Sequence, residues 1–180
     1  LLFPLAEKGR REIACKVFKL KEGDVFEGEV EFIDVSNSTK SSTKSAHNNA
    51  LSHFHAIILH TNKPEETIAR YCWLTNQSSP RRIFGSSWKV GLDQQTIIVC
   101  SEEDVERIVP SVNVSNLPSI LGYALLTESL SKTKDCFSHN ELVTQSLNQG
   151  SFLVKLPEFI NGNLIIGTSA ADFQWNGDFN

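Results

Sequence analysis

Alternation of apolar and polar residues with a period of two is the feature that most restricts the fold of this 180-residue chain. Successive side chains of a strand point to opposite faces, so such runs are typical of half-buried strands. Residues 11–20 (REIACKVFKL) and 25–35 (VFEGEVEFIDV) show the pattern, and Gly23 marks a turn between them. Further strands are predicted at 53–61, 67–75, 81–85 and 96–100, with the first two of these forming a hairpin around residues 62–66.

The pattern changes after residue 100, where signals for helix termini appear. Ser101, followed three residues later by Asp104, is typical of a capping box and predicts a helix that Pro110 closes. Pro118 in a first turn, before an apolar helical face, predicts a second helix over 117–130. A further helix is predicted over 138–150, then a strand over 151–156. Residues 36–50 are polar low-complexity sequence and predict a long loop.

Six or more short strands followed by a few short helices predict a mainly β chain of the α+β class. A small barrel or a sandwich with helical plugs fits this order. The sequence shows no internal repeat with the short period of solenoids or propellers, and a parallel βαβ order is not supported. The length fits a single domain with a sizeable core, and no apolar run is long enough to span a bilayer.

Charge is distributed unevenly along the chain, which carries −4 overall. Residues 1–92 hold 13 Lys and Arg against 10 Asp and Glu, and residues 93–180 hold 4 against 11. The stretches 35–64 and 67–92 contain no acid at all. A modest overall charge therefore conceals a basic region that is suited to binding phosphate, although acid-poor loops also arise by chance.

Residues 71–89 (YCWLTNQSSPRRIFGSSWK) combine three cations with amides and hydroxyls. Arg and Lys can donate to guanine, Asn and Gln can pair with adenine, and hydroxyls bind phosphate oxygens. Residues 6–12 (AEKGRRE) form a second basic loop. Composition alone leaves DNA binding and two solvated turns equally open.

Motifs of common enzymes are missing from the sequence. There is no Gly-rich dinucleotide loop, phosphate-binding P-loop, GxSxG, HExxH or CxxC pair, and none of the 21 acids is followed two residues later by Lys. His53 and His55 share a strand face, but a zinc site needs three or four convergent ligands. Residues 46–55 (AHNNALSHFH) resemble part of an HNH nuclease motif, but they lack the residues that flank its metal.

Four cysteines and three N-x-[ST] sequons, at Asn37, Asn76 and Asn113, would suit a secreted glycoprotein. Cys15, Cys72 and Cys100 lie in strand-like runs, however, where a reduced thiol behaves as a small hydrophobe. We therefore expect free thiols and a cytoplasmic protein, with a secreted interaction domain as an alternative.

Five segments in the same order resemble the N-terminal effector domain of EcoRII-type restriction endonucleases, a B3-like DNA-binding pseudobarrel. The segments lie within residues 52–172: AIILHTNKPEETIARYCWLTN, SPRRIFGSSWK, IIVCSEEDVERIVPS, NLPSILGYALL and FLVKLPEFINGNLIIG. The resemblance implies an open β-barrel with flanking helices over residues 1–172. Residues 173–180 would then be a linker toward a C-terminal nuclease domain, and the protein would be a prokaryotic, DNA-associated one.

In that family, two arms on one side of the barrel grip the major groove of double-stranded DNA. The resemblance places the C-terminal arm at about 74–89, with Arg82 as the best-matched arginine, and the N-terminal arm at 7–11. The candidate DNA contacts are Lys8, Gly9, Arg10, Arg11, Thr75, Asn76, Gln77, Ser78, Ser79, Arg81, Arg82, Ser86, Ser87, Trp88 and Lys89.

The function implied is sequence-specific targeting within a type II restriction endonuclease, at a CCWGG-like site. No catalytic activity, metal or cofactor is then expected on this domain, because Mg²⁺ would serve only the attached nuclease, and no membrane partner is expected. The sequence departs from the family in having Ser78, Ser79 and Pro80 where more cations are usual, in a short N-terminal arm, and in the insertion at 36–50. A divergent Mg²⁺-dependent nuclease domain remains an alternative.

Overall fold

The computed structural model describes residues 16–20, 25, 31–34, 48–112, 117–157 and 162–176. The chain divides into two compact units, residues 1–45 and 46–180. In the first unit, β1 (Lys16–Lys19) pairs antiparallel with β2 (Glu31–Asp34), and Lys19 forms an ion pair with the facing Glu31. These two strands confirm the described parts of the runs predicted at 11–20 and 25–35.

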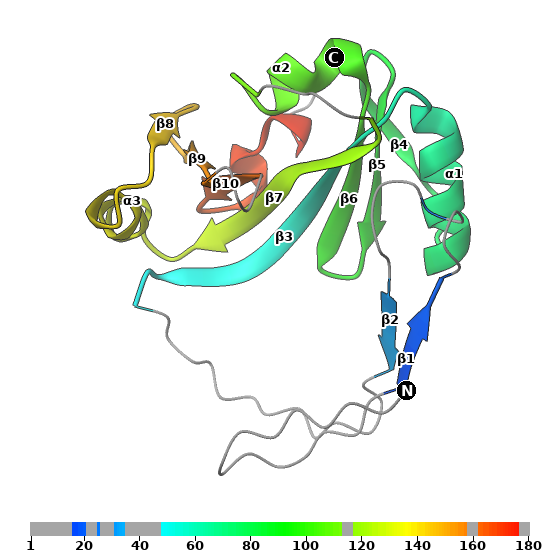
Figure 1. The fold of residues 1–180 in the computed structure, drawn as a ribbon, viewed down its shortest axis with the longest axis horizontal. Coiled ribbons are helices and arrows are strands. Elements are labelled where there is room, and N and C mark those ends of the chain that lie inside the picture. Colours follow the sequence, from blue (N-terminus) through cyan, green and yellow to red (C-terminus); the bar gives the residue numbers. More distant parts are fainter. Residues whose placement is uncertain are drawn as a thin grey trace. The chain divides into compact units, whose positions relative to one another are not determined.

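The second unit is an open, mixed sheet of eight strands in the order β4-β5-β6-β3-β7-β10-β9-β8. Figure 1 shows the strands and the few helices that accompany them. Its strands are β3 (Leu51–His60), β4 (Arg81–Phe84), β5 (Ser87–Leu92), β6 (Gln95–Cys100), β7 (Ser119–Thr127), β8 (Thr144–Ser146), β9 (Ser151–Lys155) and β10 (Asn163–Gly167). Its helices are α1 (Pro64–Thr75), α2 (Val105–Ile108), α3 (Leu130–His139) and the 3₁₀ turns η1 (Glu102–Asp104), η2 (Ala170–Asp172) and η3 (Gln174–Asn176).

The sheet is built from two βαβββ modules of the same topology. In each module the first strand pairs in parallel with the last, β3 with β6 and β7 with β10, and the antiparallel pair of β3 with β7 joins the modules. The interval from the start of β3 to the start of β7 equals the interval from the start of β6 to the start of β10. This interval is longer than the periods of solenoid and propeller repeats, for which the sequence shows no signal. The sequence also did not predict the two parallel strand pairs, because a parallel βαβ order was not supported.

The B3-like pseudobarrel predicted from the sequence was wrong. The fold is α+β, but its sheet is open, because β4 and β8 form the two ends of the strand order and each pairs with only one neighbour in the described chain. The pseudobarrel was implied by the sequence resemblance, and the count of short strands that fitted it does not distinguish a barrel from an open sheet.

Residues 67–75 form the end of α1 and not the predicted strand. Pro64 lies in the first turn with Glu65 and Glu66, and the helix ends at Asn76 in the left-handed conformation, with φ of 54°. Pro at the first position, acids at the N-terminus and a left-handed C-cap are all helix-boundary signals. They outweighed the strand preference of the β-branched and aromatic residues in this segment.

Residues 119–127 form β7, where a helix was predicted. This strand is central, between β3 and β10, so it is apolar on both faces and lacks the alternation that identifies a half-buried strand. The helix predicted at 138–150 was also misplaced: α3 precedes it, with the Ser129 hydroxyl accepting from the Lys132 N–H at the N-cap. The strands predicted at 53–61, 81–85, 96–100 and 151–156 are confirmed by β3, β4, β6 and β9.

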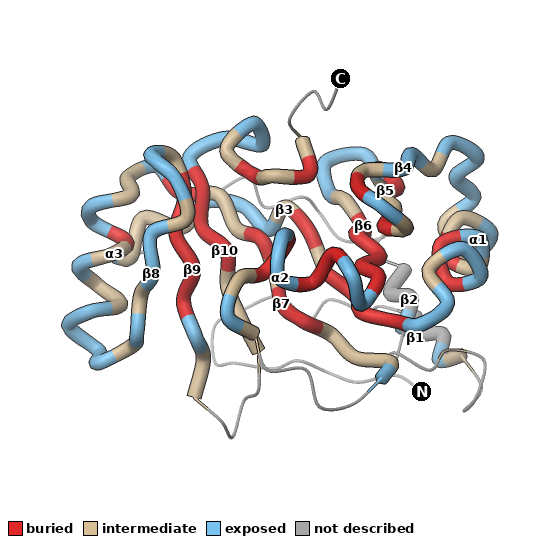
Figure 2. The backbone as a smooth tube through the Cα atoms, turned by 90° about the horizontal axis from the view of Figure 1, so that it is seen from above, coloured by how far each residue is buried: buried red, intermediate tan, exposed pale blue. Residues whose placement is uncertain are grey.

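Buried residues lie along the strands of the sheet (Figure 2), and they form hydrophobic clusters on both of its faces. One face packs against α2 and residues 173–176, and it includes Ile58, Ile98, Leu153 and Ile165. On the opposite face, α1 packs on β5 and β6, and residues of α3 pack on Phe152, Val154 and Ile166. None of the helices in the described ranges combines the length and apolar character needed to cross a membrane.

Phe173 and Trp175, where the sequence predicted the start of a linker, lie in this core. Phe173 is 2% exposed and Trp175 is 1% exposed, and their rings stack with centroids 5.1 Å apart. The Phe173 ring also stacks on His55 of β3, at 5.1 Å. Residues 177–180 lie outside the described residues.

Candidate phosphate-binding site

The predicted C-terminal arm, residues 74–89, consists of the last turn of α1, a short connection and the β4–β5 hairpin at one edge of the sheet. Thr75 ends α1 and donates its hydroxyl to the Tyr71 carbonyl at 2.7 Å. The Gln77 N–H donates to the Cys72 carbonyl, 2.9 Å away, which fixes the chain where it leaves the helix. Asn76, Gln77, Ser78 and Ser79 lie in the connection, and Ser86 lies in the hairpin turn. This arrangement is a sheet edge and not a projecting arm.

The register of the hairpin places cations opposite one another. Arg81 of β4 faces Lys89 of β5, and Arg82 faces Trp88. The Arg82 guanidinium carbon lies 5.7 Å from the centre of the Trp88 ring, within the usual range of a cation–π contact. Arg81 and Arg82 are both exposed, so the edge strand presents two adjacent arginines to solvent.

A pocket of about 310 Å³ lies over the start of this hairpin. It is lined by Gln77, Ser79, Arg81, Lys89, Val90, Gly91, Thr96 and Asn176. Two of these residues are cationic and none is a carboxylate. The absence of acids in residues 67–92 therefore holds for the pocket as well, because the α1–β4 connection, β4, β5, β6 and η3 bring only basic, neutral polar and apolar groups to it.

Lys89 is the half-buried cation of the pocket. Its ammonium donates to the Trp175 carbonyl and to Asn176 Oδ1, each at 2.8 Å. Burial lowers the pKa of Lys89, and the charge of Arg81 lowers it further. A lysine ammonium has three N–H donors, so one donor remains beyond these two contacts.

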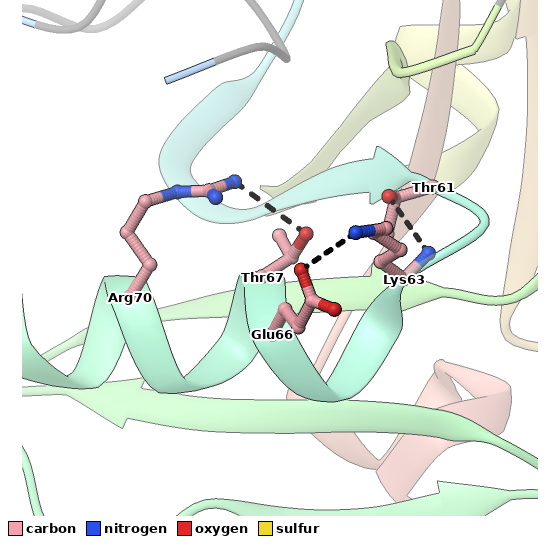
Figure 3. Close-up of polar contacts among 5 residues, drawn as sticks. All are labelled: Thr61, Lys63, Glu66, Thr67 and Arg70. Carbon is pink, nitrogen blue, oxygen red and sulfur yellow. Dashed lines mark hydrogen bonds and ion pairs between the residues drawn. The ribbon is translucent and has the colours of Figure 1, made fainter. Parts of the chain in front are cut away.

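The other polar side chains of the pocket have no such partners. Within the described part of the chain, the side chains of Gln77, Ser79, Arg81 and Thr96 take part in no hydrogen bond or ion pair. Lys63, the N-cap residue of α1, and Arg70 within α1 differ in this respect (Figure 3). Lys63 pairs with Glu66 at 3.1 Å, and Arg70 donates to the Thr67 hydroxyl, 3.5 Å away. The pocket thus gathers donors that the fold itself leaves unused.

Ser87 points into the protein and is fully buried. Its hydroxyl donates to the Asp104 carboxylate at 2.7 Å and accepts from the Ser101 N–H at 2.9 Å. The Ser101 hydroxyl also donates to Asp104, at 2.8 Å, and makes no cap hydrogen bond, so the capping box predicted here does not form. Ser87 therefore holds η1 against β5 and offers no group to a ligand at the surface.

The remaining sequence candidates fall into two groups. Lys8, Gly9, Arg10 and Arg11, together with the sequon residues Asn37 and Asn113, lie outside the described residues. His53 is exposed, whereas His55 is half-buried and burial, with the charge of Lys89, lowers its pKa. Among the described residues, no three His, Cys, Asp or Glu side chains cluster as a metal site would require. Sequence reasoning missed Thr96 and Asn176 as pocket residues, because only the fold brings β6 and η3 beside Arg81.

No protein-family model matches the chain, and no curated protein matches it. Solved structures similar to it include methylmalonyl-CoA epimerase from Mycobacterium tuberculosis, with a TM-score of 0.49 and 6% identity over 73% of this chain and 93% of that chain. Lactoylglutathione lyase from Agrobacterium tumefaciens has a TM-score of 0.27 and 11% identity over 64% of this chain and 92% of that chain. Both of these proteins are enzymes, and the expectation that this chain carries no catalytic activity is therefore withdrawn. At these TM-scores neither likeness assigns a reaction to it.

Proposed function

We propose that the β4–β5 edge binds double-stranded DNA through the phosphate backbone. The observation that supports this most directly is the pair of exposed arginines, Arg81 and Arg82, on an edge strand beside a pocket without carboxylates. Guanidinium groups bind phosphate bidentately, and the amides and hydroxyls at 76–79 are suited to further phosphate oxygens.

The geometry favours contacts to the backbone over reading of bases. An edge strand of four residues in a sheet does not extend into a groove as a loop would, and Ser87 and Lys89 are already bonded within the fold. Phosphate contacts position a protein on DNA but carry no sequence information by themselves. Sequence-specific reading of a CCWGG-like site, attachment to a nuclease domain and a cytoplasmic, DNA-associated role stay parts of the proposal that rest on the sequence resemblance.

Binding of a labelled duplex of about 20 base pairs, measured by fluorescence anisotropy at about 50 mM and about 200 mM salt, tests the proposal. We expect affinity to fall steeply with salt, because phosphate contacts release counterions. Arg82→Gln should weaken binding by about 1 kcal/mol, roughly fivefold, and reduce the salt slope by about one.

Lys132→Gln is the matched control, since it removes one positive charge from α3, which packs against the other module of the sheet. It should leave affinity within about twofold, as expected for a charge far from the contact. Absence of binding at the lower salt concentration, or an equal loss in both variants, would rule out this surface as a DNA-binding edge.

A further inference from the structure

The pocket over Arg81 and Lys89 holds two positive charges that have no counter-ion among the described residues. The two residues are directly opposite in the β4–β5 register, and like charges in this position repel. The mutual effect is visible in Lys89, whose pKa is lowered by Arg81 after the larger effect of burial. An anion placed between them would attract both cations and remove the repulsion.

Neutral donors surround the same space. Gln77 follows α1, Ser79 precedes β4 and Thr96 lies in β6, and none of the three side chains has a hydrogen-bond partner among the described residues. A phosphate group has several acceptor oxygens and needs donors from more than one direction. These three elements supply them.

The dimensions of the pocket suit a small ligand group. The volume of about 310 Å³ is at the lower end of the range of about 300 to 1,000 Å³ for ligand pockets. Gly91 contributes to the open floor, because a Cβ atom added there would meet no atom within 4 Å. A phosphate with a small substituent fits this space.

Lys89 is also held in position before any ligand arrives. The contacts of its ammonium to the Trp175 carbonyl and Asn176 Oδ1 restrict its side chain. A cation that is already ordered loses less conformational entropy on binding, which favours affinity.

We propose that this pocket is a binding site for a dianionic phosphate group, either inorganic phosphate or a small phosphomonoester. Arg81 and the remaining Lys89 N–H supply the cationic donors, and Gln77, Ser79 and Thr96 supply the neutral ones. The site goes beyond the DNA-binding proposal, because a backbone phosphodiester carries a single charge and does not match two cations as a dianion does.

Isothermal titration calorimetry with inorganic phosphate, ribose 5-phosphate and dimethyl phosphate tests this assignment. We expect the two dianions to bind at least tenfold more tightly than dimethyl phosphate, which represents a backbone phosphodiester. Tighter binding of ribose 5-phosphate than of inorganic phosphate would identify an ester as the source, and equal binding would identify the free ion.

Arg81→Gln should reduce the affinity for ribose 5-phosphate at least tenfold, and Thr96→Val about threefold, while Lys132→Gln should stay within twofold of the unmodified protein. Thermal unfolding of Arg81→Gln verifies that the exposed substitution leaves the fold intact. Undetectable binding of both dianions, or equal binding of dimethyl phosphate, would overturn the assignment. Because Arg82 lies outside the pocket, the DNA and phosphate proposals can fail independently.

Discussion

Trp175→Ala tests whether the segment after η2 belongs to the folded core. Trp175 is 1% exposed, and its ring stacks on Phe173 with an interplanar angle of 4°. Replacing a buried Trp by Ala costs about 3–5 kcal/mol, including about 0.5–1.5 kcal/mol for an aromatic pair. The Trp175 Nε1–H is buried without a partner among the described residues, and removing an unsatisfied donor recovers part of this loss. We therefore expect a loss of about 3 kcal/mol in the free energy of unfolding.

Urea unfolding followed by far-ultraviolet circular dichroism measures this loss without depending on tryptophan fluorescence. With an m-value of about 2 kcal/mol/M, the midpoint should fall by about 1.5 M. Trp73→Ala is the matched control, because Trp73 is 81% exposed on α1, and its loss should be within about 0.5 kcal/mol. If both variants lose less than about 0.5 kcal/mol, residues 173–176 are a linker after all and their packing against Ile165 and His55 is wrong.

Further substitutions test other parts of the second unit. Burial lowers the pKa of His60 below 6.5, and the charge of Glu102 partly opposes this effect. The unfolded chain therefore binds the proton more readily than the folded protein does, and stability is lost as the pH falls from 6.5 toward the pKa of the folded protein. His60→Leu should change the free energy of unfolding at pH 7 by less than about 1 kcal/mol. In urea titrations, the variant should lose less free energy of unfolding between about pH 7 and pH 5 than the unmodified protein, and an equal loss in both would refute this. Gly122→Ala should cost about 1–3 kcal/mol, because the new Cβ would lie 2.3 Å from the Asn163 carbonyl oxygen, whereas Gly91→Ala should cost less than about 0.5 kcal/mol in thermal unfolding. Equal effects of the two glycine substitutions would contradict the close approach of β7 and β10.

Local pattern was a sound guide where apolar and polar residues alternate along a strand. β1 and β2 were predicted for this reason, whereas β4 shows no such alternation, because Arg81 and Arg82 are adjacent and both exposed. The pattern failed for β7, since a central strand with both faces covered shows no alternation. For α1 the error was the reverse, because a strand was predicted where a helix forms. The helix-boundary signals at Pro64 and Asn76 were present, but the prediction followed the β-branched and aromatic residues between them.

The order of strands in the sheet lay beyond what local pattern can provide. The two βαβββ modules share a topology, while some of their equivalent strands, such as β4 (RRIF) and β8 (TQS), have little sequence in common. Parallel pairs such as β3 with β6 depend on contacts between residues far apart in the chain, as between Ala56 and Thr96. Such pairing is specified by the packing of the whole sheet and not by either strand alone.

For the candidate site, the sequence pointed to residues 71–89, but it did not show that they form a helix end, a connection and a hairpin at the sheet edge. The absence of acids around Arg81 and Lys89 was visible in the sequence and holds in the pocket. Ser87 was included with its neighbours because composition does not show which hydroxyls turn inward toward Asp104. Thr96 and Asn176 carried no signal, since they are ordinary polar residues that become relevant only beside the cations.

The central claim is that the Arg81–Arg82 edge binds the phosphate backbone of duplex DNA. The most direct measurement compares duplex binding by the unmodified protein, an Arg81→Gln/Arg82→Gln double variant and Lys132→Gln, by fluorescence anisotropy at about 50 mM salt. We predict a loss of at least about tenfold in the double variant, corresponding to about 1.4 kcal/mol, and a change within about twofold in the control. Equal affinities for all three proteins, or no binding by any of them, would contradict the claim.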